Sequence, residues 1–271
     1  MRTLILALLL AASAPAHAQA QPRNEGVEVH KSRFLVLPAS TVERSAAGQY
    51  AQLMRQASQK NALNVERRQV ERLRNIARTL IPHSTRFNKD AQRWRWEVNL
   101  ISSRTVNAFC MPGGKIAFFT GIIDALQLTD AEVAAIMGHE IAHALLEHGR
   151  ARMSENIAKQ LGIVAIASYF NLGQLSTEML AQAANLMVSL PYARKHETDA
   201  DLVGLELAAR AGYDPRAAAD VWRKMSKLAA AGGRGQPPQF ASTHPSHDTR
   251  IRDIEANLPK VLPFYESGRA R

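Results

Sequence analysis

The segment from Gly138 to His143 places two histidines and one glutamate in an otherwise apolar stretch. Residues four apart on an α-helix are rotated by only about 40° from each other, so His139 and His143 would project from one face and reach the same cation. Glu140 would lie about 100° round the helix, where a carboxylate can contact a metal-bound water without displacing it. This HExxH spacing is typical of a zinc site that activates water for hydrolysis.

The flanking residues predict that this segment lies in a buried helix. Thr129 and Glu132 have the spacing of a capping box, and Gly149 follows as a stop signal. Alanine, valine, isoleucine, methionine and leucine occupy most other positions from 131 to 146. A five-residue pattern can arise by chance, but two histidines and a glutamate destabilise a buried helix unless they have partners. A metal ion is the simplest partner.

A tetrahedral catalytic zinc needs a third protein ligand, and a second predicted helix offers one. This helix begins near a proline and ends at a glycine, over residues 191–212. Glu197 and Asp201 share one of its faces, so Glu197 could bind the metal while Asp201 accepts a hydrogen bond from a ligand histidine. The alternative is a solvated acidic face, which the apolar residues that follow disfavour. His196, about 100° from Glu197, is expected to face elsewhere.

In these motifs the chain resembles the gluzincins of metallopeptidase family forty-eight, the BepA, HtpX and Oma-type zinc metallopeptidases. The matching motifs, in order, are the "NAxxxPGG" segment Asn107–Ile116, HEIAH at 139–143, the ExxAD pattern at 197–201, and the THP segment at 243–245 followed by Arg250 and Ile251. The resemblance runs from about Thr41 to about Asn257. It implies an α+β fold, a mainly helical gluzincin metallopeptidase domain with a small β-sheet beside the HExxH helix.

The resemblance also implies roles for individual residues. One Zn²⁺ per subunit would be bound by His139, His143 and Glu197, with Glu140 as the general base and Asp201 as the acid that orients a ligand histidine. His244 would fill the fourth zinc position as a removable plug, or else stabilise the oxyanion. Arg250 would point toward the cleft, the alternative being a surface ion pair. His148, about 140° from the zinc face on a continuous helix, is expected to be a bystander, as are His30, His83 and His247.

The region before the zinc helix predicts a site for the substrate backbone. Alternating or apolar segments predict strands at 94–100, 106–110 and 116–120, after two amphipathic helices at 41–60 and 65–80. The last strand is expected to be an edge to which an extended peptide adds by backbone hydrogen bonds, which suits unfolded proteins. The expected substrate-binding residues are Pro112, Gly113, Gly114, Lys115 and Ile116.

The N-terminal sequence predicts export. Residues 1–18 have a positive start, a short apolar run and a small-x-small cleavage site, which are typical of a signal peptide. We expect an N-terminal extension at 19–40 and the zinc metallopeptidase domain at 41–271. No cysteine lies at the cleavage site, and the apolar run 161–170 is too short to cross a bilayer, so the prediction is a periplasmic protein that is neither a lipoprotein nor membrane-spanning. The single cysteine, Cys110, is expected to be a small buried side chain.

The chain carries 34 Lys and Arg against 24 Asp and Glu, a formal charge of +10. One predicted helix holds five of the arginines: Arg67, Arg68, Arg72, Arg74 and Arg78. Sparse aromatic residues and the absence of a nucleic-acid motif argue against nucleic-acid binding, and a solvated face or contact with an anionic membrane surface is favoured.

The prediction for function is a zinc endopeptidase that acts on unfolded or misfolded envelope proteins, with the outer-membrane assembly machinery as a candidate partner. One alternative is a chaperone-like binding protein whose zinc is capped by His244 and which rarely cleaves. A purely structural zinc domain is disfavoured, because three ligands and a placed glutamate leave one position open.

Overall fold

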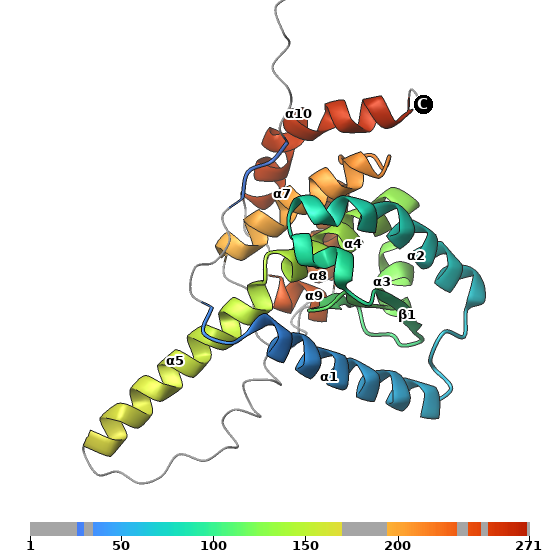
Figure 1. Cartoon of the computed structure of the whole chain (residues 1–271). Coiled ribbons are helices and arrows are strands. Elements are labelled where there is room, and N and C mark those ends of the chain that lie inside the picture. Colours follow the sequence, from blue (N-terminus) through green and yellow to red (C-terminus); the bar gives the residue numbers. More distant parts are fainter. Residues whose placement is uncertain (1–25, 30–34, 170–193, 232–237, 245–248, 270–271) are drawn as a thin grey trace, which may run out of the picture.

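The computed structural model describes residues 26–29, 35–169, 194–231, 238–244 and 249–269. In these ranges, helices surround one small three-stranded sheet (Figure 1). The helices are α1 (Ala39–Gln59), α2 (Arg67–Leu80), α3 (Thr120–Leu126), α4 (Asp130–Leu145), α5 (His148–Tyr169), α7 (Arg194–Arg210), α8 (Ala217–Ala231), α9 (Gln239–Thr243) and α10 (Arg250–Arg269), with 3-10 helices η1 (Ile81–Arg86) and η2 (Lys89–Arg93). The strands are β1 (Glu97–Ile101), β2 (Ala108–Met111) and β3 (Lys115–Phe119). The expected α+β class is confirmed.

The sheet order is β1-β3-β2, with β1 parallel and β2 antiparallel to β3. The prediction that the strand at 116–120 is an edge is therefore wrong, because β3 is the central strand and has a neighbour on both sides. Its Ile116 is fully buried, and its carbonyl accepts a hydrogen bond from the Tyr50 hydroxyl at 2.6 Å. The edge strand beside α4 is β2.

The central helix of the fold is α4, and its N-terminus forms as predicted. Thr129 accepts a hydrogen bond from the Glu132 backbone N–H, and the Glu132 carboxylate accepts one from Thr129 N–H at 2.8 Å, which completes the capping box. From Glu132 to Leu145 every residue of α4 is buried. Burying a large aliphatic side chain stabilises a fold by about 1.5–3 kcal/mol, so this helix contributes strongly to the core.

The end of α4 differs from the prediction. The helix stops at Leu145 rather than at Gly149, because Glu147 adopts a left-handed conformation with φ 57°. The next helix, α5, starts at His148 and extends away from the body of the molecule (Figure 1). Among the described residues, no helix combines the length and the apolar character needed to cross a bilayer. The segment expected to be a signal peptide lies outside the described ranges.

Residues 26–29, part of the expected N-terminal extension, pack against α7. Val27 is 5% exposed and belongs to the main core, and its backbone N–H donates to Glu206 Oε2 at 2.6 Å. Glu206 is fully buried and also pairs with Arg86 and Arg210, each at 2.6 Å. Gly26 has φ 84°, and a Cβ there would lie 2.2 Å from the Glu206 carboxylate. This carboxylate therefore joins the N-terminal segment and η1 to α7.

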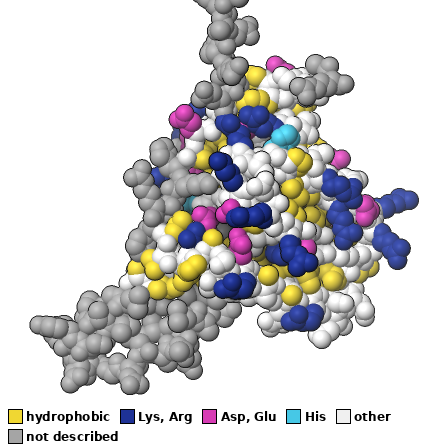
Figure 2. Space-filling model, in the orientation of Figure 1, with side chains coloured by type: hydrophobic (Ala, Val, Ile, Leu, Met, Phe, Trp, Pro, Cys, Tyr) yellow, Lys and Arg dark blue, Asp and Glu magenta, His cyan; other side chains and the backbone are white. Residues whose placement is uncertain are grey.

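The arginine-rich helix α2 is amphipathic, as predicted. It buries Val70, Leu73, Ile76, Ala77 and Leu80. Of its arginines, Arg72 pairs with Asp130 at 2.5 Å, and Arg74 and Arg78 approach Glu71. Figure 2 shows Lys and Arg side chains over much of the visible face, with a group on the side where α2 lies in Figure 1.

Candidate metal centre

Four side chains from three elements meet in a buried cluster. His139 and His143 come from α4, Glu197 from α7, and His244 from the residue after α9. One donor atom from each lies within 4.8 Å of all the others, and all four residues are buried. We call this set the donor cluster.

The distances in the donor cluster match those around a single ion. His143 Nε2 lies 3.0 Å from His139 Nε2 and 3.4 Å from Glu197 Oε1. His244 Nδ1 lies 3.3 Å from His139 Nε2 and 3.2 Å from Glu197 Oε1. Ligand atoms that are each 2.0–2.1 Å from a tetrahedral zinc are roughly 3.3 Å apart. The nitrogen and carboxylate donors, their burial and their spacing therefore fit zinc.

Close packing of α4 on α7 creates this geometry. Glu197, Asp201 and Gly204 follow the i, i+4, i+7 spacing of one helix face. A Cβ added to Gly204 would lie 2.8 Å from the His139 backbone nitrogen, so only glycine allows this approach. Gly212, with φ 81°, ends α7 where predicted; the Tyr213 N–H donates to the Ala208 carbonyl at 2.9 Å.

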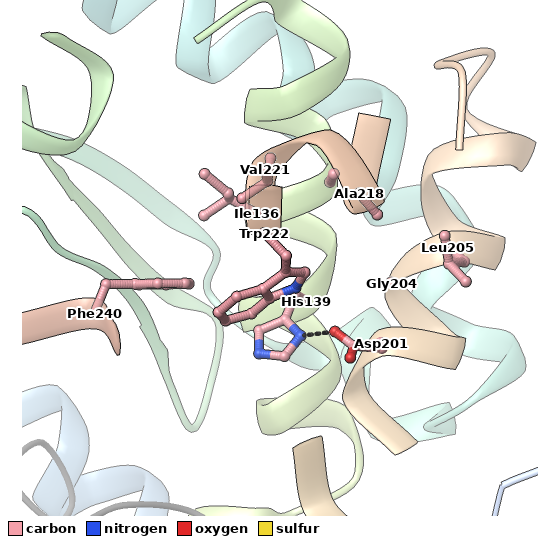
Figure 3. A pocket seen from close by; sticks show the side chains of 10 residues that line it. Ile136, His139, Asp201, Gly204, Leu205, Ala218, Val221, Trp222 and Phe240 are labelled. Atoms are coloured by element: carbon pink, nitrogen blue, oxygen red, sulfur yellow. Dashed lines mark hydrogen bonds and ion pairs between the residues drawn. The ribbon is translucent and has the colours of Figure 1, made fainter. Parts of the chain in front are cut away.

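His139 has the partner that was predicted for a ligand histidine. Its Nδ1 lies 2.9 Å from Asp201 Oδ1, drawn as a dashed line in Figure 3. The indole of Trp222 and the ring of Phe240 flank the same imidazole, with centroids 6.4 and 6.5 Å away. Burial lowers the pKa of His139, but Asp201 and Glu197 raise it to about 9. A cation bound here would therefore displace a proton from the cluster.

Arg250, at the start of α10, contacts the carboxylates of both Glu197 and Asp201 on α7. It donates to Asp201 Oδ2 and to Glu197 Oε2, each at 2.7 Å, and its guanidinium lies 3.6 Å from the Trp222 ring centroid. The side chain is 1% exposed, so the alternative of a surface ion pair is wrong. Burial lowers the pKa of Arg250, but the two carboxylates raise it above its usual value.

Glu197 is ionised despite complete burial. Burial raises the pKa of this carboxyl, but His244 and hydrogen bonds from His139 and His143 hold it well below its usual range. Burial keeps the pKa of His143 well below its usual value, so this imidazole is neutral. An ionised carboxylate and a neutral imidazole are the forms that bind a metal ion.

Glu140 lies beside the donor cluster without belonging to it. Its carboxyl is 3% exposed, and His244 Nε2 lies 3.3 Å from Oε1. Within the described residues, Oε1 has no hydrogen-bond partner. Burial raises the pKa of Glu140, while His244, His139 and a hydrogen bond from the Cys110 backbone lower it. A buried carboxyl oxygen of this kind can receive a proton from a bound reactant.

His148 is not a bystander, contrary to the prediction. Its Nδ1 lies 3.0 Å from Nδ1 of His143, and its ring stacks on that of His196 with centroids 4.2 Å apart. The prediction assumed one continuous helix, whereas the turn at Glu147 brings His148 back toward α4. Burial lowers the pKa of His148 to about 2, so this ring is neutral. His83 lies in η1 near Arg210 and Glu206, and His30 and His247 lie outside the described residues.

The expected substrate-binding residues divide into two groups. Pro112, Gly113 and Gly114 form the turn between β2 and β3, and both glycines have positive φ, 81° and 78°. A Cβ at Gly114 would lie 2.6 Å from the Trp96 side chain, so this position needs glycine. Lys115 and Ile116 instead belong to the central strand, where Lys115 Nζ donates to Glu97 Oε1 at 2.6 Å. These two therefore have structural contacts rather than a free strand edge.

Comparison with known proteins places this centre in a family. A model described as peptidase family M48 matches residues 67–258. The mitochondrial metalloendopeptidase OMA1 of Schizosaccharomyces pombe is 40% identical over 175 residues, which cover 64% of this chain and 50% of that protein. The metalloprotease LoiP of Escherichia coli is 28% identical over 181 residues, covering 66% and 69%. A Vibrio cholerae protein named for enhancing β-barrel assembly is 30% identical over 193 residues, covering 64% and 38%.

The chain belongs to peptidase family M48, since the family model covers most of it. It spans about half of the length of the S. pombe OMA1 protein and less of the V. cholerae one.

Proposed function

We propose that this M48 family member is a zinc-dependent metalloendopeptidase. The observation that carries the proposal is the donor cluster with the Glu140 carboxylate beside it. His139, His143 and Glu197 would bind the zinc, and Asp201 and Arg250 would hold His139 and Glu197 in position. Zinc bound there would act as a Lewis acid that polarises a peptide carbonyl and acidifies water.

Glu140 is the proposed general base. Its buried Oε1 lies beside the cluster, 3.3 Å from His244 Nε2, and has no hydrogen-bond partner within the described residues. Burial raises its pKa toward the range in which a carboxylate can both accept a proton from the attacking water and return it to the leaving amine nitrogen. This role requires that Glu140 not be a zinc ligand.

His244 is the proposed plug of the resting enzyme. Its Nδ1 occupies the fourth corner of the donor cluster, and its Nε2 lies 3.3 Å from Glu140. A peptide carbonyl and a water would need the same space. His244 would therefore have to move before substrate is cleaved, and a partner or substrate that moves it would activate the enzyme.

The edge strand β2 is the proposed place for the substrate backbone. Among the described strands it pairs only with β3, and the backbone of Cys110 within it hydrogen-bonds the Glu140 carboxylate. An extended peptide added to β2 would thus bring its carbonyl groups toward Glu140. Backbone pairing requires little of the substrate sequence, which suits unfolded protein.

The proposed setting is the periplasm, with unfolded or misfolded envelope proteins as substrates and the outer-membrane assembly machinery as a candidate partner. The signal-like sequence at 1–18 and the names of the bacterial relatives support this setting, whereas the OMA1 relative is mitochondrial. The arginines of α2 would favour peripheral contact with an anionic membrane surface.

The second candidate function is a chaperone-like binding protein that rarely cleaves. The observation that favours it is His244 in the fourth corner of the cluster. In that case β2 would still bind extended chains, but the zinc would stay capped.

Incubation with unfolded casein distinguishes the peptidase from the chaperone-like binding protein. Wild type and His244→Ala are assayed for internal cleavage by mass spectrometry, with and without a chelator and with zinc added back. The peptidase proposal expects chelator-sensitive internal cleavage that zinc restores. If neither protein cleaves while both suppress aggregation of the casein, the binding function is correct and the peptidase proposal fails.

A further inference from the structure

The two histidines of α4 use their ring nitrogens in the same way. Nε2 of each points into the donor cluster, where the two atoms are 3.0 Å apart. Nδ1 of each points away from it, toward Asp201 for His139 at 2.9 Å and toward His148 for His143 at 3.0 Å. His148 therefore contacts Nδ1 of His143 in the same way as Asp201 contacts Nδ1 of His139.

The tautomer that a metal-bound histidine must adopt determines which of His143 and His148 donates the hydrogen bond between them. An imidazole binds a cation through an unprotonated nitrogen, so His143 must carry its proton on Nδ1 when Nε2 faces the metal. His143 Nδ1–H then donates, and His148 Nδ1 accepts. We infer that His148 is a positioning residue that holds His143 in the tautomer and ring orientation required for zinc binding.

Packing fixes His148 itself. The side chain is fully buried, and its ring lies nearly parallel to that of His196, with an interplanar angle of 16°. The left-handed turn at Glu147 folds the start of α5 back onto α4. His196 precedes the ligand Glu197 on α7, so one turn of α7 supplies both a zinc ligand and the surface on which His148 stacks.

His148 differs from Asp201 in charge. Asp201 is a carboxylate paired with Arg250, whereas His148 is an imidazole. A neutral acceptor orients His143 without adding another negative charge beside Glu197. A partner of this kind on the outer nitrogen of a ligand histidine is worth about 10–100-fold in metal affinity.

Two substitutions separate the hydrogen bond from the packing. His148→Phe retains an aromatic ring that can stack on His196 but has no acceptor. His148→Asn loses the ring but keeps an acceptor, because asparagine Oδ1 is separated from the backbone by the same number of bonds as histidine Nδ1. If Phe is not tolerated, His148→Leu replaces it, since Leu is close to Asn in size and has no acceptor.

The test rests on the proposed zinc site and uses the full chain at one fixed pH. Zinc affinity is measured by competition with a chromophoric chelator, and the Co²⁺-loaded proteins are compared by their visible absorption spectra. Thermal unfolding of the metal-free proteins gives the structural effect separately.

We expect His148→Phe to lose about 10–100-fold in zinc affinity and to change the Co²⁺ spectrum, while His148→Asn stays within about threefold of wild type. Unchanged affinity in His148→Phe would overturn the inference, as would equal losses in both variants that track the stability of the metal-free proteins. Failure of the wild type to bind zinc would instead overturn the proposed function, so the two failures are distinguishable.

Discussion

Gly138 on α4 and Gly204 on α7 face each other so closely that a side chain at either position would press on the backbone of the other helix. A Cβ at Gly138 would lie 3.0 Å from the Gly204 carbonyl oxygen, and one at Gly204 would lie 2.8 Å from the His139 nitrogen. Both contacts are with backbone, which cannot move aside cheaply. This pair sets the distance between the helix of the two histidines and the helix of Glu197 and Asp201.

Gly204→Ala should therefore lower both stability and zinc affinity. Overpacking of this kind costs about 1–3 kcal/mol in the free energy of unfolding, because the methyl group must push α7 away from α4. The measurements are denaturant unfolding and chelator competition. Gly48→Ala on α1, where a Cβ meets no heavy atom within 4 Å, is the matched control and should lose neither. Wild-type zinc affinity in Gly204→Ala would contradict the proposed role of the close approach.

Glu206→Gln should lower the free energy of unfolding, with a smaller effect on the proposed zinc site and its activity. The neutral amide keeps the shape but leaves Arg86 and Arg210 without their buried counter-charge, which should cost about 3 kcal/mol since both arginines are partly exposed. Denaturant unfolding measures the loss. The control is Glu71→Gln on α2, whose side chain is 58% exposed and should change stability by about 0.5 kcal/mol or less. Equal effects of the two substitutions would refute the anchoring role of Glu206.

Glu197→Ala should reduce bound zinc sharply below one ion per chain, because it removes a ligand. Asp201→Ala removes only the partner of His139 Nδ1 and should lower zinc affinity by about 10–100-fold. Metal analysis of the purified proteins and chelator competition measure the two effects. Stoichiometric zinc in Glu197→Ala would show that the proposed ligand set is wrong.

His244→Ala should raise basal proteolysis and self-cleavage while zinc remains bound by the other three residues. The reason is that the fourth corner of the donor cluster and the space beside Glu140 become accessible to water and substrate. Ser242→Ala, an exposed change on α9, is the control and should leave the casein cleavage rate unchanged. If His244→Ala keeps its zinc but cleaves far more slowly, His244 stabilises the transition state instead.

Local sequence patterns predicted much of the fold because its signals lie close together in the chain. The capping box at Thr129, the buried α4, the amphipathic α2 and the stop at Gly212 each depend on residues within a few positions. The strands also lie near their predicted places. The expectation that the strand at 116–120 is an edge was wrong, since strand pairing depends on distant segments and the pattern of these residues does not distinguish a central strand from an edge.

The candidate site likewise contains residues that local spacing predicted and one that it missed. Helical spacing placed His139 and His143 on one face of a helix with Glu140 about 100° round from them, and the ExxAD pattern placed Glu197 and Asp201 on one face of another. His148 was missed since an angle on a continuous helix does not apply across the left-handed turn at Glu147. A histidine three residues after the end of α4 is the signal that could have found it.

The aromatic neighbours of His139 left no local signal. Trp222 and Phe240 come from α8 and α9 and reach the imidazole only through tertiary packing (Figure 3). Arg250 was identified by resemblance, but its burial between Asp201 and Glu197 could not be derived from its position at the start of α10.

The most direct test of the central claim is a paired measurement of bound zinc and casein cleavage in Glu140→Gln. The substitution keeps the size of the side chain and removes the base without removing a ligand. We predict full zinc occupancy and wild-type stability, with cleavage reduced by about 10²–10⁴-fold. Loss of zinc in proportion to activity would show that Glu140 is a ligand, and undiminished cleavage with zinc bound would show that the catalytic base lies elsewhere.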